Sequence, residues 1–287
     1  MALRQVLSQY ISSCRRALHD ASGKFWTTAD LTEYVNEGRS QTAAMTGCVR
    51  SLVTAYISSG VEMFTIGGVV GGFVTNSGSG YTTINVAVSG DGTGATATGT
   101  LVAGKLTAIV MTDLGSGYTN ASFTITGDGA SAAATAYVLT DDAIDIMNIT
   151  VWWGNQRVPL RYMPFTEFNA KMRGWPTNTQ QPLVWSRYGT VGGVAFMQPV
   201  PDQTYRTEFD LAVTTADLVS DSSVDELKYP YTIPVIDYAC YKAKEQQQSF
   251  GEAERFEAKF KQKILMAQAA VQMRRIPNPN NGYSGAG

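Results

Sequence analysis

The sequence predicts an α+β protein: a helical body built from N- and C-terminal helices with a small antiparallel β subdomain, plus an inserted all-β domain made of two 37-residue repeats. Three observations predict this class. Apolar residues recur at helical spacing near both ends of the chain. Charge and helical periodicity almost vanish between residues 64 and 138, where Gly, Thr, Ser, Ala and Val dominate. Inside that stretch, GSGYT followed by GDG occurs twice.

Two helical patterns begin the chain. In residues 2–20, apolar side chains recur every three or four positions. Thr27 or Thr28 can cap a second helix, and Asp30 falls in its first turn, where a carboxylate interacts favourably with the helix dipole. Because the apolar spacing continues, we expect this helix to extend to about Gly60.

Each repeat of the insert, residues 62–140, predicts three strands separated by glycine turns. Two such units would make a domain of about six strands, and together they can close a β core that neither unit could bury alone. The expected strands lie at 69–75, 84–89, 106–112 and 122–126, with an Ala- and Thr-rich strand after each pair.

The glycine turns hold the candidate residues of the insert: Gly78, Gly80, Tyr81, Gly115, Gly117 and Tyr118. The glycines suit turns with positive φ, and the tyrosines are expected to pack over the hairpins. A phosphate loop is not predicted, because no GK[ST] follows and no helix begins there. Asp91 and Asp128 are interpreted as turn carboxylates, while a Ca²⁺ site, which needs six to eight oxygens, stays an open alternative.

Ordinary composition returns in residues 141–275. A short helix is expected at 163–172. A long helical pattern runs from Ile233 to about Arg274, and Gly251 would bend or split it. Strands are expected at 147–153, 157–162, 183–188, 193–198 and 205–213.

Composition argues against an enzyme, a cofactor or a metal site. The net charge of −2 gives no broad electrostatic footprint for nucleic acid. Cys14, Cys48 and Cys240 fit no metal spacing and are interpreted as buried thiols in helix-like stretches. The single His19 can build neither a zinc site nor a catalytic triad. Without a signal-peptide pattern or a membrane-spanning run, folding in a cytoplasm is expected.

Aromatic and charged residues outside the repeats receive structural interpretations. Trp152 and Trp153 alternate along a strand, so one should face the core and the other a partner or solvent. Trp175 and Trp185 are expected to be core or interface anchors. Solvated positions are expected for the short acidic and basic groups, which are Asp141, Asp142, Asp145, Arg15, Arg16, Arg274 and Arg275.

Four stretches outside the insert resemble the head-to-tail adaptor (connector) proteins of tailed bacteriophages, and their order and spacing carry the likeness. They are RRALHD at 15–20 with FWTTADLTEYVNEGRSQTA at 25–43, ITVWWGNQRVPLRYMPFTEFNAKMRGW at 149–175, VAFMQPVPDQTYRTEFDLAV at 194–213, and IPVIDYACYKAKEQQQSFGEAERFEAKFKQKI at 233–264.

The resemblance implies a non-enzymatic virion protein of the neck, assembled in the host cytoplasm. It would form a homo-oligomeric ring, commonly of twelve copies, that joins the portal ring to tail or nozzle proteins. Genomic DNA would pass through its channel without sequence-specific binding, and no membrane partner is implied. Residues 1–61 and 141–275 would form the adaptor body. The flexible tail, 276–287, would dock on the portal through Ile276, Pro277, Asn278, Pro279 and Tyr283.

The insert departs from the simplest pattern of that family. Its duplicated β repeat and the five tryptophans of the chain leave a second function open. This alternative is a glycan-binding adhesin or tail accessory protein that acts through the β-repeat domain.

Overall fold

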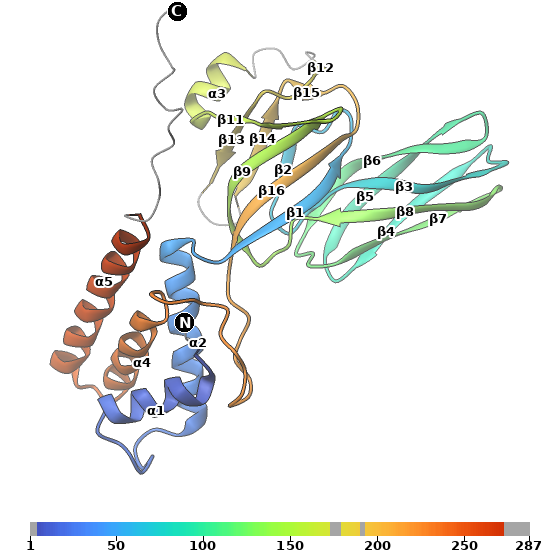
Figure 1. The fold of residues 1–287 in the computed structure, drawn as a ribbon. Helices are drawn as coiled ribbons and strands as arrows, with labels where there is room; N and C mark the ends of the chain where they lie inside the picture. Colours follow the sequence, from blue (N-terminus) through green and yellow to red (C-terminus); the bar gives the residue numbers. More distant parts are fainter. Residues whose placement is uncertain (1–4, 173–178, 190–192, 273–287) are drawn as a thin grey trace, which may run out of the picture. The chain divides into compact units, whose positions relative to one another are not determined.

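The computed structural model describes residues 5–172, 179–189 and 193–272, and its fold is α+β (Figure 1). The chain divides into two compact units. The helical unit comprises residues 1–49 and 214–287, and the sheet unit comprises residues 50–213.

The helical unit contains α1 (Leu7–Ala17), α2 (Thr28–Thr46), α4 (Ile233–Gln246) and α5 (Phe250–Gln272). Thr27 caps α2 as expected: its hydroxyl accepts from the amide of Asp30, whose carboxylate accepts from the amide of Thr27. The first three of these helices share one apolar core. Its fully buried members include Tyr10, Cys14, Leu31, Val35, Val235, Ala239 and Cys240.

A buried ion pair attaches the segment between β16 and α4 to the helices α1 and α2. Arg39 of α2 has no exposed surface, and its Nε and Nη2 lie 3.0 and 2.9 Å from Oδ1 of Asp225. The hydroxyl of Tyr10 donates to Oδ2 of Asp225 over 2.6 Å. Burial first, and then Asp225, raise the pKa of Tyr10 well above its usual range, so the hydroxyl keeps its proton. Arg39 Nη1 donates to the carbonyl of Ala216 over 2.8 Å.

The sheet unit contains two four-stranded sheets that belong to no repeat. Phe64 and Phe209 meet in their shared core with ring centroids 5.8 Å apart, and Trp185 is buried there too. The first sheet has the order β1 (Arg50–Ile57), β16 (Tyr205–Val213), β9 (Ala143–Trp153), β10 (Gln156–Pro159). The second has the order β11 (Arg161–Tyr162), β13 (Val184–Tyr188), β14 (Val194–Gln198), β2 (Met63–Thr65). The remaining elements here are β12 (Thr179–Gln180), β15 (Val200–Pro201) and the expected short helix α3 (Phe165–Lys171).

Six strands occupy residues 69–138, where the repeats predict them. They are β3 (Val69–Ser79), β4 (Ile84–Gly90), β5 (Thr93–Val102), β6 (Lys105–Ser116), β7 (Ala121–Gly127) and β8 (Ala130–Val138). Strand β7 is β4 shifted by 37 residues, and these two strands pair with each other. The first strand of each 37-residue unit pairs with the third strand of the other, as β3 with β8 and β6 with β5. Neither unit therefore completes its own pairing.

One boundary prediction is wrong: the second helix does not continue to Gly60. It ends at Thr46, Gly47 adopts the left-handed conformation with φ 57°, and β1 follows. Leu52 and Tyr56, four residues apart, fit one face of a helix but also one face of a strand. Cys48 consequently lies beyond the helix and is half-buried, whereas the other two cysteines are buried in α1 and α4.

The long C-terminal helical pattern is split, but not at Gly251. Helix α4 ends at Gln246, where the amide of Gln247 still donates to the carbonyl of Ala243. Gln248 then takes the left-handed conformation with φ 60°, which reverses the chain before α5. Gly251 falls inside the first turn of α5.

We expect Asp225→Ala to destabilise the helical unit by about 3–5 kcal/mol, because it leaves the Arg39 guanidinium buried without a counter-charge. Urea unfolding followed by the helical circular dichroism signal measures the change. The matched control is Glu226→Ala, which removes an exposed carboxylate at the next residue and should stay within about 0.5 kcal/mol. Equal effects of the two variants would contradict the role given to Asp225.

Candidate functional site

The six predicted turn residues of the insert lie where its two units cross. All four glycines adopt the left-handed conformation that favours glycine, as the sequence predicts. Their φ angles are 62° at Gly78, 78° at Gly80, 64° at Gly115 and 73° at Gly117.

The two tyrosines are buried and cover the GDG turn of the opposite unit. A Cβ added to Gly129 would lie 2.5 Å from the ring of Tyr81, and one added to Gly92 would lie 2.5 Å from the ring of Tyr118. Tyr81 is 6% exposed and Tyr118 is 3% exposed. The GSGYT tyrosine of each unit thus packs on a glycine in the GDG turn of the other unit.

The aspartates of the GDG turns repeat this exchange with hydrogen bonds. Asp128 accepts from the amides of Thr82 and Thr83, each over 2.9 Å, and from the hydroxyl of Thr82. Asp91 accepts from the amides of Thr119 and Asn120 over 3.1 and 3.0 Å, and from the hydroxyl of Thr119. Each unit therefore fixes the GSGYT turn of the other.

These donors stabilise the ionised carboxylates. The hydrogen bond from the Thr119 hydroxyl, and then the amide of Asn120, lower the pKa of Asp91 to about 2. The equivalent donors, with the Thr82 hydroxyl first, hold the pKa of Asp128 far below its usual range. Both carboxylates accept hydrogen bonds from amides and threonine hydroxyls, and the described residues hold no cluster of three or more His, Cys, Asp or Glu that could bind a metal ion.

A groove of about 580 Å³ lies beside the Asp91 turn. The groove is lined by small and mostly polar residues, which include Ser89, Asp91, Thr119, Asn120 and Ser122. The hydroxyls of Ser89 and Ser122 lie 3.2 Å apart across β4 and β7. This set of hydroxyl, amide and carboxylate groups can form hydrogen bonds with a polyol.

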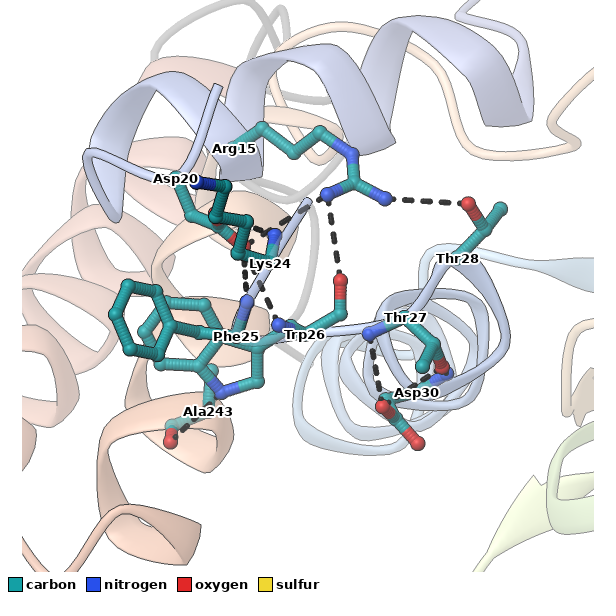
Figure 2. A network of polar contacts seen from close by, with 9 residues as sticks. All are labelled: Arg15, Asp20, Lys24, Phe25, Trp26, Thr27, Thr28, Asp30 and Ala243. Carbon is teal, nitrogen blue, oxygen red and sulfur yellow. Dashed lines mark hydrogen bonds and ion pairs between the residues drawn. The ribbon is translucent and has the colours of Figure 1, made fainter. Parts of the chain in front are cut away.

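The connection between α1 and α2 forms a second polar cluster, shown in Figure 2. The carboxylate of Asp20 accepts from the amides of Lys24, Phe25 and Trp26 over 2.9, 3.2 and 3.2 Å. Burial alone would raise the pKa of Asp20, but these amides and Arg15 lower it. Asp20 thereby holds the loop that leads into the cap of α2.

Arg15 belongs to this cluster instead of a solvated face, which corrects the prediction for the basic pair. It donates to the carbonyl of Trp26 over 3.3 Å and to the hydroxyl of Thr28 over 3.1 Å (Figure 2). The indole of Trp26 donates to the carbonyl of Ala243 in α4 over 3.3 Å. Arg15 therefore organises the helical unit, while its neighbour Arg16 is exposed.

The tryptophans of β9 face opposite sides of the sheet, as expected. Trp153 packs against the buried core, while the guanidinium of Arg206 lies 4.8 Å from the ring of Trp152 on the other face. The prediction of a solvated position is wrong for Asp145, the last residue of the acidic group. Asp145 lies within β9 and pairs with Arg187.

Several predicted positions lie outside the described residues. They are Trp175, Arg274, Arg275 and the tail residues Ile276, Pro277, Asn278, Pro279 and Tyr283.

Sequence reasoning missed the Arg39–Asp225 pair, although a signal was present. Arg39 follows Leu31 and Val35 at intervals of four on the buried stripe of α2. A charged residue at a core position of a helix predicts a buried partner.

We expect the thermal stability of the insert to fall as the pH is lowered from about 4 towards 2. A carboxylate whose pKa is lowered on folding stabilises the fold above its unfolded pKa of about 4 and loses that contribution as it is protonated. The double variant Asp91→Asn, Asp128→Asn should have a flatter melting temperature across this window. Parallel pH curves for the wild type and the double variant would show that these turns do not depend on ionised aspartates.

Comparison of the sequence with models of known protein families identifies a match to one family. The family model described as SU10 adaptor protein matches residues 95–282, which is more than half of the chain and extends from β5 beyond α5. No curated protein matches the chain. No helix in the described ranges has an apolar stretch long enough to cross a membrane. The chain therefore belongs to the SU10 adaptor protein family, a family of phage head-to-tail adaptors.

Proposed function

We propose that this protein is a non-enzymatic, ring-forming adaptor that joins a portal to a tail and extends the channel for the genome. The observation that carries the proposal is the family match over residues 95–282. Family membership makes the protein a structural component of a phage. The portal, the ring and the passage of DNA are the specific parts of the proposal.

The pairing of the strands supports a division of the chain into an inserted module and an adaptor body. Strands β3 to β8 pair with one another in two sheets, whereas β2, Met63–Thr65, pairs with β14. We propose that the repeat is an inserted module whose own strands begin at Val69, within the boundaries 62–140. The adaptor body then comprises residues 1–61 and 141–275, and β2 at the start of the segment 62–140 pairs with this body and not with the repeat.

We assign portal docking to the tail, residues 276–287. Its two prolines restrict the unbound backbone, so less conformational entropy is lost when the peptide is ordered on a partner. Its carbonyl and amide groups can also pair with the partner's backbone. The residues proposed for this contact are Ile276, Pro277, Asn278, Pro279 and Tyr283.

Native mass spectrometry of the full chain, alone and with its phage's purified portal ring, tests this function. We expect a closed ring, or monomers that assemble on the portal. Deletion of residues 276–287 should abolish portal binding without lowering the melting temperature of the chain, because the deleted segment lies beyond the last described helix. A wild-type chain that stays monomeric and ignores the portal would refute the adaptor function.

The polar groove beside Asp91 favours a second candidate function, recognition of a glycan by the insert. Sugars are bound by converging hydroxyl, amide and carboxylate groups of the kind that line this groove. If it operates, the full chain binds glycans on an array, and Asn120→Ala weakens that binding several-fold. The control Asn85→Ala changes an exposed asparagine of β4 that is not among the groove residues and should leave binding unchanged. A flat array for the wild type removes this candidate.

A further inference from the structure

We propose that neighbouring copies in the ring bind each other through two different faces of the helical unit. On one copy, a groove between α2 and residues 214–221 receives the exposed face of α5 from the next copy. This inference rests on the ring proposed above and names the surfaces that would close it.

The groove is preformed. It has a volume of about 820 Å³, and α2 contributes Thr32, Glu33 and Asn36 to its wall. The opposite wall is held by a reciprocal pair of hydrogen bonds. The Asn36 side chain donates to the carbonyl of Leu218 over 3.1 Å, and the amide of Leu218 donates to the Asn36 side chain over 2.9 Å. Little ordering is therefore needed before a partner binds.

The groove combines negative charge with an exposed apolar residue. Glu33, Asp217 and Asp221 line it and are exposed to solvent. Val219, also in the lining, is 85% exposed. Glu37 is a fourth acidic residue here, but Lys242 lies 3.4 Å from its carboxylate. The groove thus fits a segment that is basic and partly apolar.

Helix α5 presents such a face to solvent. Arg255, Lys259, Gln262 and Met266 follow each other at intervals of four, three and four residues, so they lie on one side of the helix. All four are exposed, and the buried residues Ala253, Phe260, Ile264 and Ala267 lie on the opposite side. Met266 and its neighbour Leu265 are 58% and 66% exposed.

The positive charge of this face comes from Arg255 and from Lys259, whose Nζ lies 5.2 Å from the ring of Phe256. Lys261 pairs with Glu257, and Lys263 pairs with Asp237, so these two lysines are neutralised within the chain. Arg255 and Lys259 supply the charge that the acidic groove requires, and Leu265 and Met266 supply apolar surface. Opposite charges around an apolar centre are typical of specific protein interfaces.

The two faces are distinct surfaces of one unit, which determines the kind of assembly. Helix α4 packs against both α2 and α5, and Figure 1 shows α5 and the segment before α4 on opposite sides of it. A contact between two different surfaces repeats from copy to copy, and it generates a ring when the rotation closes. A two-fold dimer would instead need one surface to pair with itself.

Charge reversal tests the contact. Variant A carries Arg255→Glu and Lys259→Glu, and variant B carries Glu33→Lys and Asp221→Lys. We expect each variant alone to lose ring assembly at least tenfold, measured as the ring fraction by native mass spectrometry. An equimolar mixture should restore rings with alternating copies, because the α5 of A then fits the groove of B, and the unchanged α5 of B fits the unchanged groove of A.

Controls separate this inference from the proposed ring and from misfolding. Lys261→Glu on the same helix should leave the ring intact, and the circular dichroism spectra of A and B should match the wild type. Rings that survive in A or B, or a mixture that fails to restore them, would overturn the contact while the adaptor function stands. A wild type that forms no ring with or without the portal would overturn both.

Discussion

One buried carboxylate holds the helical unit together. Asp225 binds Arg39 of α2 and Tyr10 of α1, and it also accepts from the amide of Leu227. The segment between β16 and α4 is thereby fixed against α1 and α2, which precede the sheets in the chain. Asn36, one turn before Arg39, holds the same segment at Leu218. Arg39 and Asn36 of α2 therefore hold the backbone of Ala216 and Leu218, in the segment that forms one wall of the acidic groove. Removal of either partner of the buried charge pair would leave the other uncompensated.

The insert uses a different device, the exchange of contacts between two similar units. Each GDG aspartate and each GSGYT tyrosine acts on the opposite unit, and the strands pair across the units in the same way. The glycines of these turns resemble a ligand-binding loop. Their role is to adopt positive φ angles and to let the tyrosine side chains pack closely. A module closed in this way depends little on its surroundings for backbone pairing, which suits an addition to an adaptor body.

The sequence predicts elements best where periodicity and turn chemistry agree. The cap of α2 and the six strands of the insert follow from Thr27 and from the repeated glycine turns. The strand β1 is missed because Leu52 and Tyr56 satisfy two periodicities, and only pairing with β16 decides between them. The break between the last helices depends on Gln248 in the left-handed conformation. The sequence predicts the break at Gly251 instead, because glycine is the residue that most often bends or ends a helix. The acidic groove of the helical unit could not be predicted, because α2 and residues 214–221, which form its walls, are far apart in the sequence.

A cryo-electron microscopy reconstruction of the assembled full chain tests the central claim most directly, since it shows both the symmetry and the surfaces between copies. The account predicts a closed ring in which α5 of each copy lies against α2 and residues 214–221 of the next. A two-fold dimer, or a ring whose copies meet only through the sheet units, would contradict it.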